Sequence, residues 1–314
     1  MPPCAGPAPL PLTAAMNATP PHVLTLIADP TTAPLTAPLL ARVREAVGGL
    51  APVLLSPGEA AEIPLPELPD RATLAAALAG APIDAIALPA AGRRKRLLIA
   101  DMDSTIVTGE TLDELADFAG LKAEIAAITM RSMNGEIDFA TALRERVGML
   151  RGLKLEALEA TWARMRLTPG ARELVATMRA HGAVTALVSG GFTFFTGKVA
   201  ALVGFDLHRS NVLEHDGEAL TGTVAEPILD RDAKLATLRA LCAERGLAVE
   251  ETLAVGDGAN DLAMLRAAGL GVAFRAKPVV AAEARARVEH SSLRALLFAQ
   301  GYRVEEIVTA PPAA

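Results

Sequence analysis

Short apolar runs in this chain predict β-strands, and stretches whose apolar residues recur at helical spacing separate them. In the N-terminal part, strands are predicted at 22–28, 52–56 and 83–88, and helices at 39–47 and 71–78. Prolines between residues 57 and 69 leave the middle of this part without an assigned element. The pattern predicts a small α/β domain over 22–92, after a disordered, Pro- and Ala-rich tail over 1–21. A regulatory or dimerising role for this domain and a purely structural one both stay open.

From residue 93 to residue 314 the alternation predicts a second, larger domain. Its strands are predicted at 97–100, 183–188, 252–255 and 270–273, and its helices at 171–180, 194–202, 233–244, 261–267 and 279–286. Short, continuously apolar strands between amphipathic helices are typical of a doubly wound parallel sheet covered on both faces. Two insertions interrupt it: a helical one at about 112–168, and one at about 209–224 that contains a hairpin with its turn at Asp216 and Gly217.

Charge and composition narrow the classes of function. The chain has 30 basic and 36 acidic residues and a net charge of −6, which argues against a general nucleic-acid surface. The basic run Arg93–Arg94–Lys95–Arg96 is therefore interpreted as a linker at the domain boundary, although such runs can bind nucleic acid. Neither a signal peptide nor an apolar stretch of membrane-spanning length stands out, and the two cysteines do not form a C-x-x-C pair. These features predict a cytoplasmic protein without a nucleic-acid or membrane partner, with a homodimer left open.

Two carboxylates directly follow the strand predicted at 97–100. Asp101 and Asp103 stand two residues apart, so an extended chain would aim them to one side, where they would repel each other without a cation between them. Mg²⁺ prefers carboxylate, carbonyl and water oxygens, so Asp101 and the main-chain carbonyl of Asp103 are candidate ligands. Asp101 could then attack phosphorus. Asp103 could give a proton to the leaving oxygen and later take one from the attacking water. The alternative is a plain helix cap, which the "DST" sequence also favours.

Two further elements would suit a phosphate group. Ser189 ends a predicted strand, and Gly190 and Gly191 are predicted to open the next helix, where a hydroxyl and free backbone N–H groups form a phosphate cradle. Lys234 lies near the start of another predicted helix and could neutralise a phosphate or a carboxylate. Read alone, the first could be an ordinary turn and the second a surface lysine.

The strongest motif is "VGDGAND", which follows the strand predicted at 252–255. Asp257 could complete a magnesium site, Asn260 could bind substrate, and Asp261 could orient the lysine or a metal-bound water. Three polar side chains within five residues, directly after an apolar strand, are more than capping requires.

In their order and spacing, "DMDST", the serine of "VSGG", Lys234 and "GDGAND" resemble the four motifs of the haloacid-dehalogenase-like phosphatases. The resemblance implies that family's α/β core with an inserted helical cap and one Mg²⁺ per site. It also implies Asp101 as nucleophile, Asp103 as general acid and base, Ser189 and Lys234 as stabilisers of charge, and Asp257 as a metal ligand.

The resemblance extends to the phosphoserine phosphatases within that superfamily, through "DMDSTIVTGETLDELA" and "MNGEIDFATALRERV". It implies that Glu110 binds the ammonium group of L-phosphoserine, that Arg146 binds its carboxylate, and that Met133 and Phe139 form apolar walls. A selective pocket for this substrate needs one acid and one guanidinium, and arginine can bind both carboxylate oxygens. The residues by themselves favour a surface role for Arg146 and do not separate it from Arg144.

Three alternatives follow from the same motifs. The chain could act on another small phosphate monoester, or transfer the phosphoryl group to an acceptor such as homoserine; only the cap residues would distinguish these. It could also be a non-catalytic, ligand-sensing module, which the intact acids in all four motifs argue against. Nucleic-acid binding through Arg93–Arg96 would be steeply salt-dependent.

Overall fold

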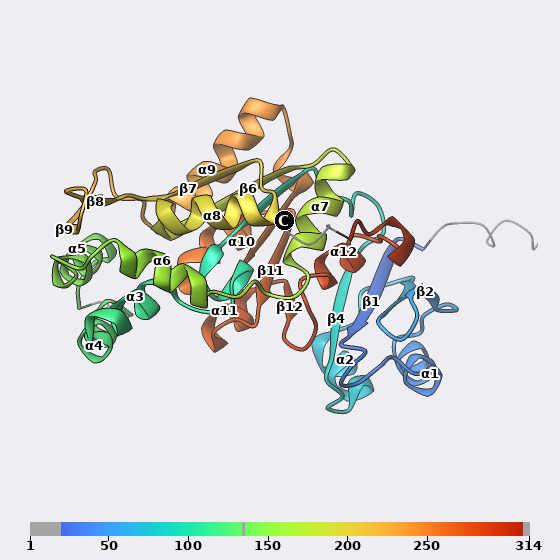
Figure 1. The fold of residues 1–314 in the computed structure, drawn as a ribbon. Helices are drawn as coiled ribbons and strands as arrows, with labels where there is room; N and C mark the ends of the chain where they lie inside the picture. Colours follow the sequence, from blue (N-terminus) through green and yellow to red (C-terminus); the bar gives the residue numbers. More distant parts are fainter. Residues whose placement is uncertain (1–19, 134–135, 310–314) are drawn as a thin grey trace, which may run out of the picture.

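The computed structural model describes residues 20–133 and 136–309, except for the side chain of Met133 (Figure 1). The tail predicted over 1–21 therefore lies almost entirely outside the described residues. Two sheets organise the chain, one antiparallel and N-terminal, the other parallel and central.

The N-terminal part is a four-stranded antiparallel sheet in the order β2-β3-β1-β4, with two helices on one face. Its elements are β1 (His22–Ala28), α1 (Ala37–Ala46), β2 (Val53–Ser56), β3 (Ala60–Leu65), α2 (Arg71–Leu78) and β4 (Ile83–Pro89). Alternate residues of β1 face opposite sides: Leu24 and Leu26 join the core under the helices, while Ile27 packs against the larger domain. The sequence left β3 unassigned because of its prolines. Pro64 is tolerated because β2 pairs with β3 only as far as Glu62, so Pro64 lies where that side of β3 has no strand partner.

The central sheet has six parallel strands in the order β12-β11-β10-β5-β6-β7. These are β5 (Leu97–Ala100), β6 (Val184–Phe192), β7 (Leu207–Asn211), β10 (Thr252–Gly256), β11 (Leu270–Phe274) and β12 (Ala286–Val288). Helices lie on both faces, namely α7 (Ala171–Ala180), α8 (Thr193–Val203) and α12 (Ala295–Ala299) on one, and α9 (Arg231–Arg245), α10 (Leu262–Ala267) and α11 (Pro278–Glu283) on the other. The four residues of β5 are all buried because Leu98 and Ala100 face the first set and Leu97 and Ile99 the second. The predicted doubly wound parallel sheet is confirmed.

Two boundaries in this sheet differ from the sequence prediction, and the sequence does not predict β7, of which residues 209–211 fall within the insertion expected at about 209–224. β6 continues through Gly190 and Gly191 to Phe192, so these glycines do not open a helix, and α8 begins only at Thr193. The helix predicted over 279–286 ends at Glu283, because Ala286 and Val288 are buried and pair with β11 as the edge strand β12. Both errors have one cause: local pattern does not reveal which neighbouring strand supplies hydrogen-bond partners.

Four helices are inserted between β5 and α7: α3 (Thr111–Ala119), α4 (Lys122–Met133), α5 (Phe139–Met149) and α6 (Glu156–Arg164). They lie over one side of the molecule, next to the hairpin formed by β8 (Leu213–His215) and β9 (Leu220–Val224) (Figure 1). Backbone hydrogen bonds join Gly152 and Leu153 to Leu220 and so connect the two insertions. We propose that α3–α6 form the cap.

The basic run between the two sheets is held by contacts within the chain. Arg93 pairs with Glu62, Arg94 with Glu306 and Arg96 with Glu251, while the ammonium group of Lys95 donates to the carbonyls of Gly92 and Glu250. These side chains therefore tie the linker to both domains, and we propose the run as the domain boundary. No helix in the described part of the chain is long and apolar enough to cross a membrane. The cytoplasmic location stays a prediction, and the homodimer stays open.

Candidate active site

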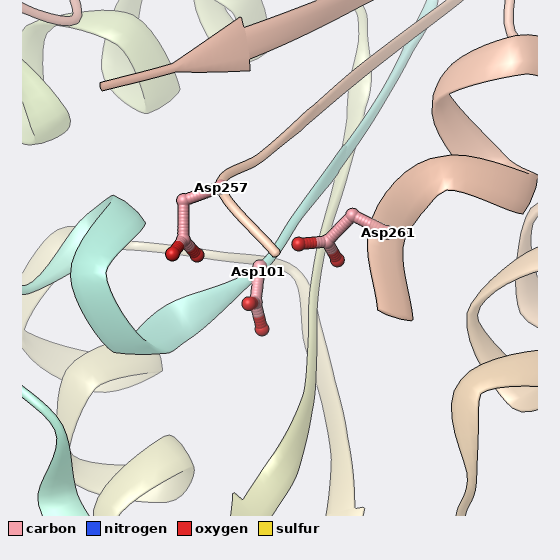
Figure 2. A group of neighbouring side chains, drawn as sticks. All are labelled: Asp101, Asp257 and Asp261. Carbon is pink, nitrogen blue, oxygen red and sulfur yellow. The ribbon is translucent and has the colours of Figure 1, made fainter. Parts of the chain in front are cut away.

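Three aspartates from separate segments meet at the carboxyl edge of the central sheet (Figure 2). Asp101 follows β5, Asp257 follows β10, and Asp261 lies at the start of α10, and one carboxylate oxygen from each lies within 4.8 Å of the others. All three side chains are buried. Adjacent parallel strands end at the same edge, so the pairing of β5 with β10 brings Asp101 to Asp257 across a large sequence separation.

Lys234 offsets part of this negative charge. Its ammonium group, carried by the first turn of α9, lies 2.7 Å from Asp101 Oδ1 and 2.6 Å from Asp261 Oδ1, and the side chain is 1% exposed. Burial lowers the pKa of Lys234, but the two carboxylates outweigh burial and raise the pKa above its usual value. Lys234 is therefore a fixed cation beside Asp101, and Asp261 orients it, as the sequence suggested.

Asp101 and Asp257 line the adjoining cavity, whereas both carboxylate oxygens of Asp261 accept hydrogen bonds within the protein. Its Oδ2 oxygen accepts a hydrogen bond from the backbone N–H of Gly258 at 3.0 Å. Gly256 makes this approach feasible, because a Cβ there would lie 2.3 Å from the Asp261 carboxyl carbon. Burial, then the charges of Asp261 and Glu110, raise the pKa of Asp257 to about 6.

The donor set fits a divalent cation. Burial and the charge of Asp261 raise the pKa of Asp101 as well, which is the expected response of carboxylates that are buried close together. Carboxylate oxygens on such a cluster are the ligand type that Mg²⁺ prefers.

Asp103 is held differently, by the start of the cap. Its Oδ1 accepts a hydrogen bond from the backbone N–H of Thr111 at 3.0 Å, and its Oδ2 one from the Thr111 hydroxyl at 3.3 Å. The capping alternative is thus partly right, because Asp103 does bind the first residue of α3. Burial, and next the charge of Glu110, raise the pKa of Asp103 to about 7 despite these bonds.

The remaining predicted residues line the same cavity, which has a volume of about 130 Å³. Its lining includes Asp101, Asp103, Glu110, Phe139, Arg146, Ser189, Gly190, Asp257 and Asn260. Ser189 is 1% exposed, and its hydroxyl accepts a hydrogen bond from the backbone N–H of Gly191 at 2.9 Å. The ring of Phe139 packs over Gly190, where an added Cβ would come within 3.2 Å of it.

The structure separates the two arginines that the sequence left equivalent. Arg144 points away from the cavity and pairs with Glu226 at 2.6 Å. Arg146 lines the cavity and is held by the Ala142 carbonyl at 3.1 Å and the Thr129 hydroxyl at 3.4 Å. Burial lowers the pKa of Arg146, an effect that nearby acids oppose. The predicted apolar wall at Met133 concerns a side chain outside the described residues.

Ser104 holds Glu110, which with Arg146 lies on the cap side of the cavity. Its hydroxyl donates to Glu110 Oε1 at 2.7 Å, and its backbone has φ +53°, a left-handed conformation that non-glycine residues rarely adopt. The carboxylate of Glu110 is thereby fixed at the cavity rim.

Comparisons with known proteins agree with this geometry. The family model of haloacid dehalogenase-like hydrolases matches residues 98–266. The chain belongs to that family. It is 39% identical over 297 residues to the phosphoserine phosphatase of Streptomyces coelicolor, covering 92% of this chain and 72% of that protein. The phosphoserine phosphatase of Archaeoglobus fulgidus is 45% identical over 188 residues, which span 60% of this chain and 55% of that protein. Among solved structures, a HAD-family hydrolase from Salmonella enterica serovar Typhi superposes with a TM-score of 0.78 at 31% identity, over 88% of this chain and 97% of its own.

Two residues of this hydrolase site escaped the sequence analysis. Thr111 stands eight positions after Asp103, too far along the chain for contact within one strand or helix, and only the turn between them brings the two together. Lys277 lines the cavity from the loop after β11. In the sequence it is one lysine before a proline, with no signal to distinguish it from a solvated side chain.

Proposed function

We propose that this family member hydrolyses L-phosphoserine to L-serine and phosphate in a Mg²⁺-dependent reaction through an aspartyl-phosphate. The observation that carries the proposal is the arrangement of one cavity. Carboxylates for phosphoryl transfer lie at the sheet edge, and an acid and an arginine, Glu110 and Arg146, lie on the cap side. The curated relatives named above are phosphoserine phosphatases, which supports the same substrate here.

Asp101 is the nucleophile in this proposal. Its Oδ1 accepts hydrogen bonds from the Met102 N–H at 2.8 Å and from Lys234, so we assign the attack on phosphorus to Oδ2. A bond forms between Oδ2 and phosphorus as the bond from phosphorus to the serine oxygen breaks. Positioning and charge stabilisation supply most of the rate enhancement in such transfers.

Asp103 moves the proton in both steps. With a pKa of about 7 it holds a proton in a large fraction of molecules at neutral pH, and it gives this proton to the departing serine oxygen. The resulting carboxylate then accepts a proton from the water that attacks phosphorus, which frees phosphate and regenerates Asp101.

Charge on the phosphoryl oxygens is offset from several sides. In the proposal the hydroxyl of Ser189, which lines the cavity, and backbone N–H groups near it stabilise these oxygens from the sheet edge, and Lys234 adds a positive charge beside Asp101. Asp101, Asp257 and the main-chain carbonyl of Asp103 would hold Mg²⁺, which when bound neutralises phosphoryl charge as a Lewis acid. On the cap side Glu110 binds the substrate ammonium, Arg146 its carboxylate, and Asn260 hydrogen-bonds the substrate.

The test is release of phosphate from L-phosphoserine, phosphothreonine and an aryl phosphate, with Mg²⁺ and with a chelator. We expect Mg²⁺-dependent turnover with a clear preference for phosphoserine. Cleavage of aryl phosphate without cleavage of phosphoserine would keep the chemistry and refute the substrate. No turnover of any ester with Mg²⁺ would refute both.

A further inference from the structure

Among the described residues that line the cavity, Lys277 is a cation that the mechanism above does not use. Lys234 is bound by Asp101 and Asp261, and Arg146 donates to Ala142 and Thr129. Lys277, by contrast, has no carboxylate within 4.0 Å of its ammonium group among the described residues. It faces acids nonetheless, because its charge lowers the pKa of Asp257, against the larger opposing effects of burial and neighbouring carboxylates.

The loop that carries Lys277 is fixed to the site by its backbone. The N–H of Lys277 donates to the carbonyl of Asp257 at 3.1 Å. Two residues earlier Arg275 adopts a left-handed conformation, with φ +43°, while its N–H donates to Val288 at 2.7 Å. A non-glycine residue in this conformation costs free energy, so the surrounding structure must impose this turn. The backbone of Lys277 is thereby fixed at the sheet edge, and the residue as a whole is exposed.

Lys277 also lies where two cavities meet. It lines the inner cavity of about 130 Å³ and a larger outer cavity of about 780 Å³. Phe139, Arg146 and Asn260 line both cavities as well, so the outer one leads to the inner one past these residues. A ligand that enters by this path passes Lys277 together with Arg231, Asp138, Asp230 and Asp232 of the outer lining before it reaches the inner carboxylates.

Those carboxylates would repel the doubly charged phosphate of a monoester. Asp101, Asp103, Glu110 and Asp257 all line the inner cavity, and Lys234 shares its charge with two carboxylates at once. An unpaired ammonium group at the entrance would offset the repulsion and raise the local concentration of the anion. We propose that Lys277 is a phosphate-recruiting residue, which attracts the phosphate group of the entering ester and also binds the inorganic phosphate product. The proposal rests on the proposed phosphatase function but not on the identity of the alcohol.

The experiment compares Lys277→Gln with wild type at low and high ionic strength, with phosphoserine and with an aryl phosphate. We expect kcat/KM for both esters to fall by about 3- to 10-fold at low salt, with a smaller decrease in kcat. The difference should shrink as salt screens the charge. The inhibition constant of inorganic phosphate should rise by a similar factor in Lys277→Gln. Lys277→Glu should lower kcat/KM and raise this inhibition constant further than Lys277→Gln does. Lys277→Arg, which keeps the charge, should retain most of the wild-type kcat/KM.

The matched control is Lys154→Gln, which removes the same charge from an exposed lysine paired with Glu218 outside both cavities. Equal effects of the two substitutions, or no effect of Lys277→Gln, would overturn the proposal. A salt-independent fall in kcat that Lys277→Arg does not restore would assign Lys277 a purely structural role and also overturn it. Phosphoserine specificity is judged separately, by comparing the two esters, and titration calorimetry with inorganic phosphate and Mg²⁺ tests Lys277 even if neither ester is cleaved.

Discussion

The sheet edge and the cap side of this cavity are built in opposite ways. At the edge, Asp101, Lys234 and Asp261 are buried and bind one another, so each side chain is fixed by charged partners. On the cap side, Glu110 is exposed and Arg146 is held by two neutral oxygens. In the proposed function, chemistry common to all phosphate esters belongs to the rigid sheet, and recognition of one alcohol belongs to the cap side, which can vary without disturbing that chemistry. Substitutions at the edge should therefore abolish turnover of every ester, whereas cap substitutions should change which ester is preferred.

The largest effect is expected for Asp101→Asn. The amide is a poor nucleophile, so kcat for both phosphoserine and aryl phosphate should fall by about 10⁴-fold or more. Steady-state phosphate release measures the loss, and circular dichroism checks that the variant is folded. Retention of aryl phosphate turnover would remove Asp101 from the nucleophile role.

Arg146→Ala should produce a smaller but selective effect. A charged hydrogen bond to the substrate carboxylate is worth about 1.5–3 kcal/mol, so kcat/KM for phosphoserine should fall by about 10- to 150-fold. Hydrolysis of an aryl phosphate, which has no carboxylate, should change little. Arg144→Ala is the matched control, because Arg144 pairs with Glu226 outside the cavity. Similar losses from both substitutions, or an equal loss with both esters, would contradict the assignment.

Ser104 provides a finer test of the cap side. Ser104→Ala and Ser104→Gly both remove the hydroxyl that binds Glu110. A hydrogen bond to a charged group contributes about 1.5–3 kcal/mol, and only part of this free energy is passed on to substrate binding by Glu110. Each substitution should therefore raise KM for phosphoserine by a few-fold. The glycine variant should be the more stable of the two by about 1 kcal/mol, because φ +53° is strained for alanine. Urea unfolding measures this difference. Normal KM values in both variants would show that Glu110 needs no such support.

The smallest expected effect concerns how Glu110, on the cap side, changes the pKa of Asp103, at the sheet edge. Glu110 contributes, after burial, to the raised pKa of Asp103, which is about 7. Glu110→Gln removes a negative charge, so the proton leaves Asp103 more readily and the pKa should fall. Because Asp103 acts first as an acid, the high-pH loss of single-turnover phosphoryl transfer should move to lower pH. A simple alkyl phosphate is the suitable substrate, because its alkoxide leaving group needs the proton of Asp103 and, without an ammonium group, it does not use Glu110 for binding. If the high-pH loss of activity stayed at the same pH or moved to higher pH, the proposed effect of Glu110 on the pKa of Asp103 would be excluded.

Much of the catalytic edge follows from the sequence alone. Short apolar strands ending in Asp101 and Asp257, and the helix that carries Lys234, are local patterns, because burial on both faces requires continuous apolar residues and the polar residues fall at the strand ends. The doubly wound sheet follows from the alternation of the same elements. These features repeat within a few residues, so they are visible without knowledge of the neighbours in space.

Only the tertiary structure decided the features that depend on a partner far along the chain. The strands β3 and β12 exist because β1 and β11 supply their hydrogen bonds, despite a proline in one and a helical pattern near the other. Arg146 differs from Arg144 because their positions on α5 aim one toward the cavity and the other toward Glu226. Lys277 gains its position from a backbone bond to Asp257, which no periodicity encodes. The local sequence determines which residues are buried at regular intervals. Tertiary packing determines which distant segments pair, and that pairing in turn determines where their side chains point.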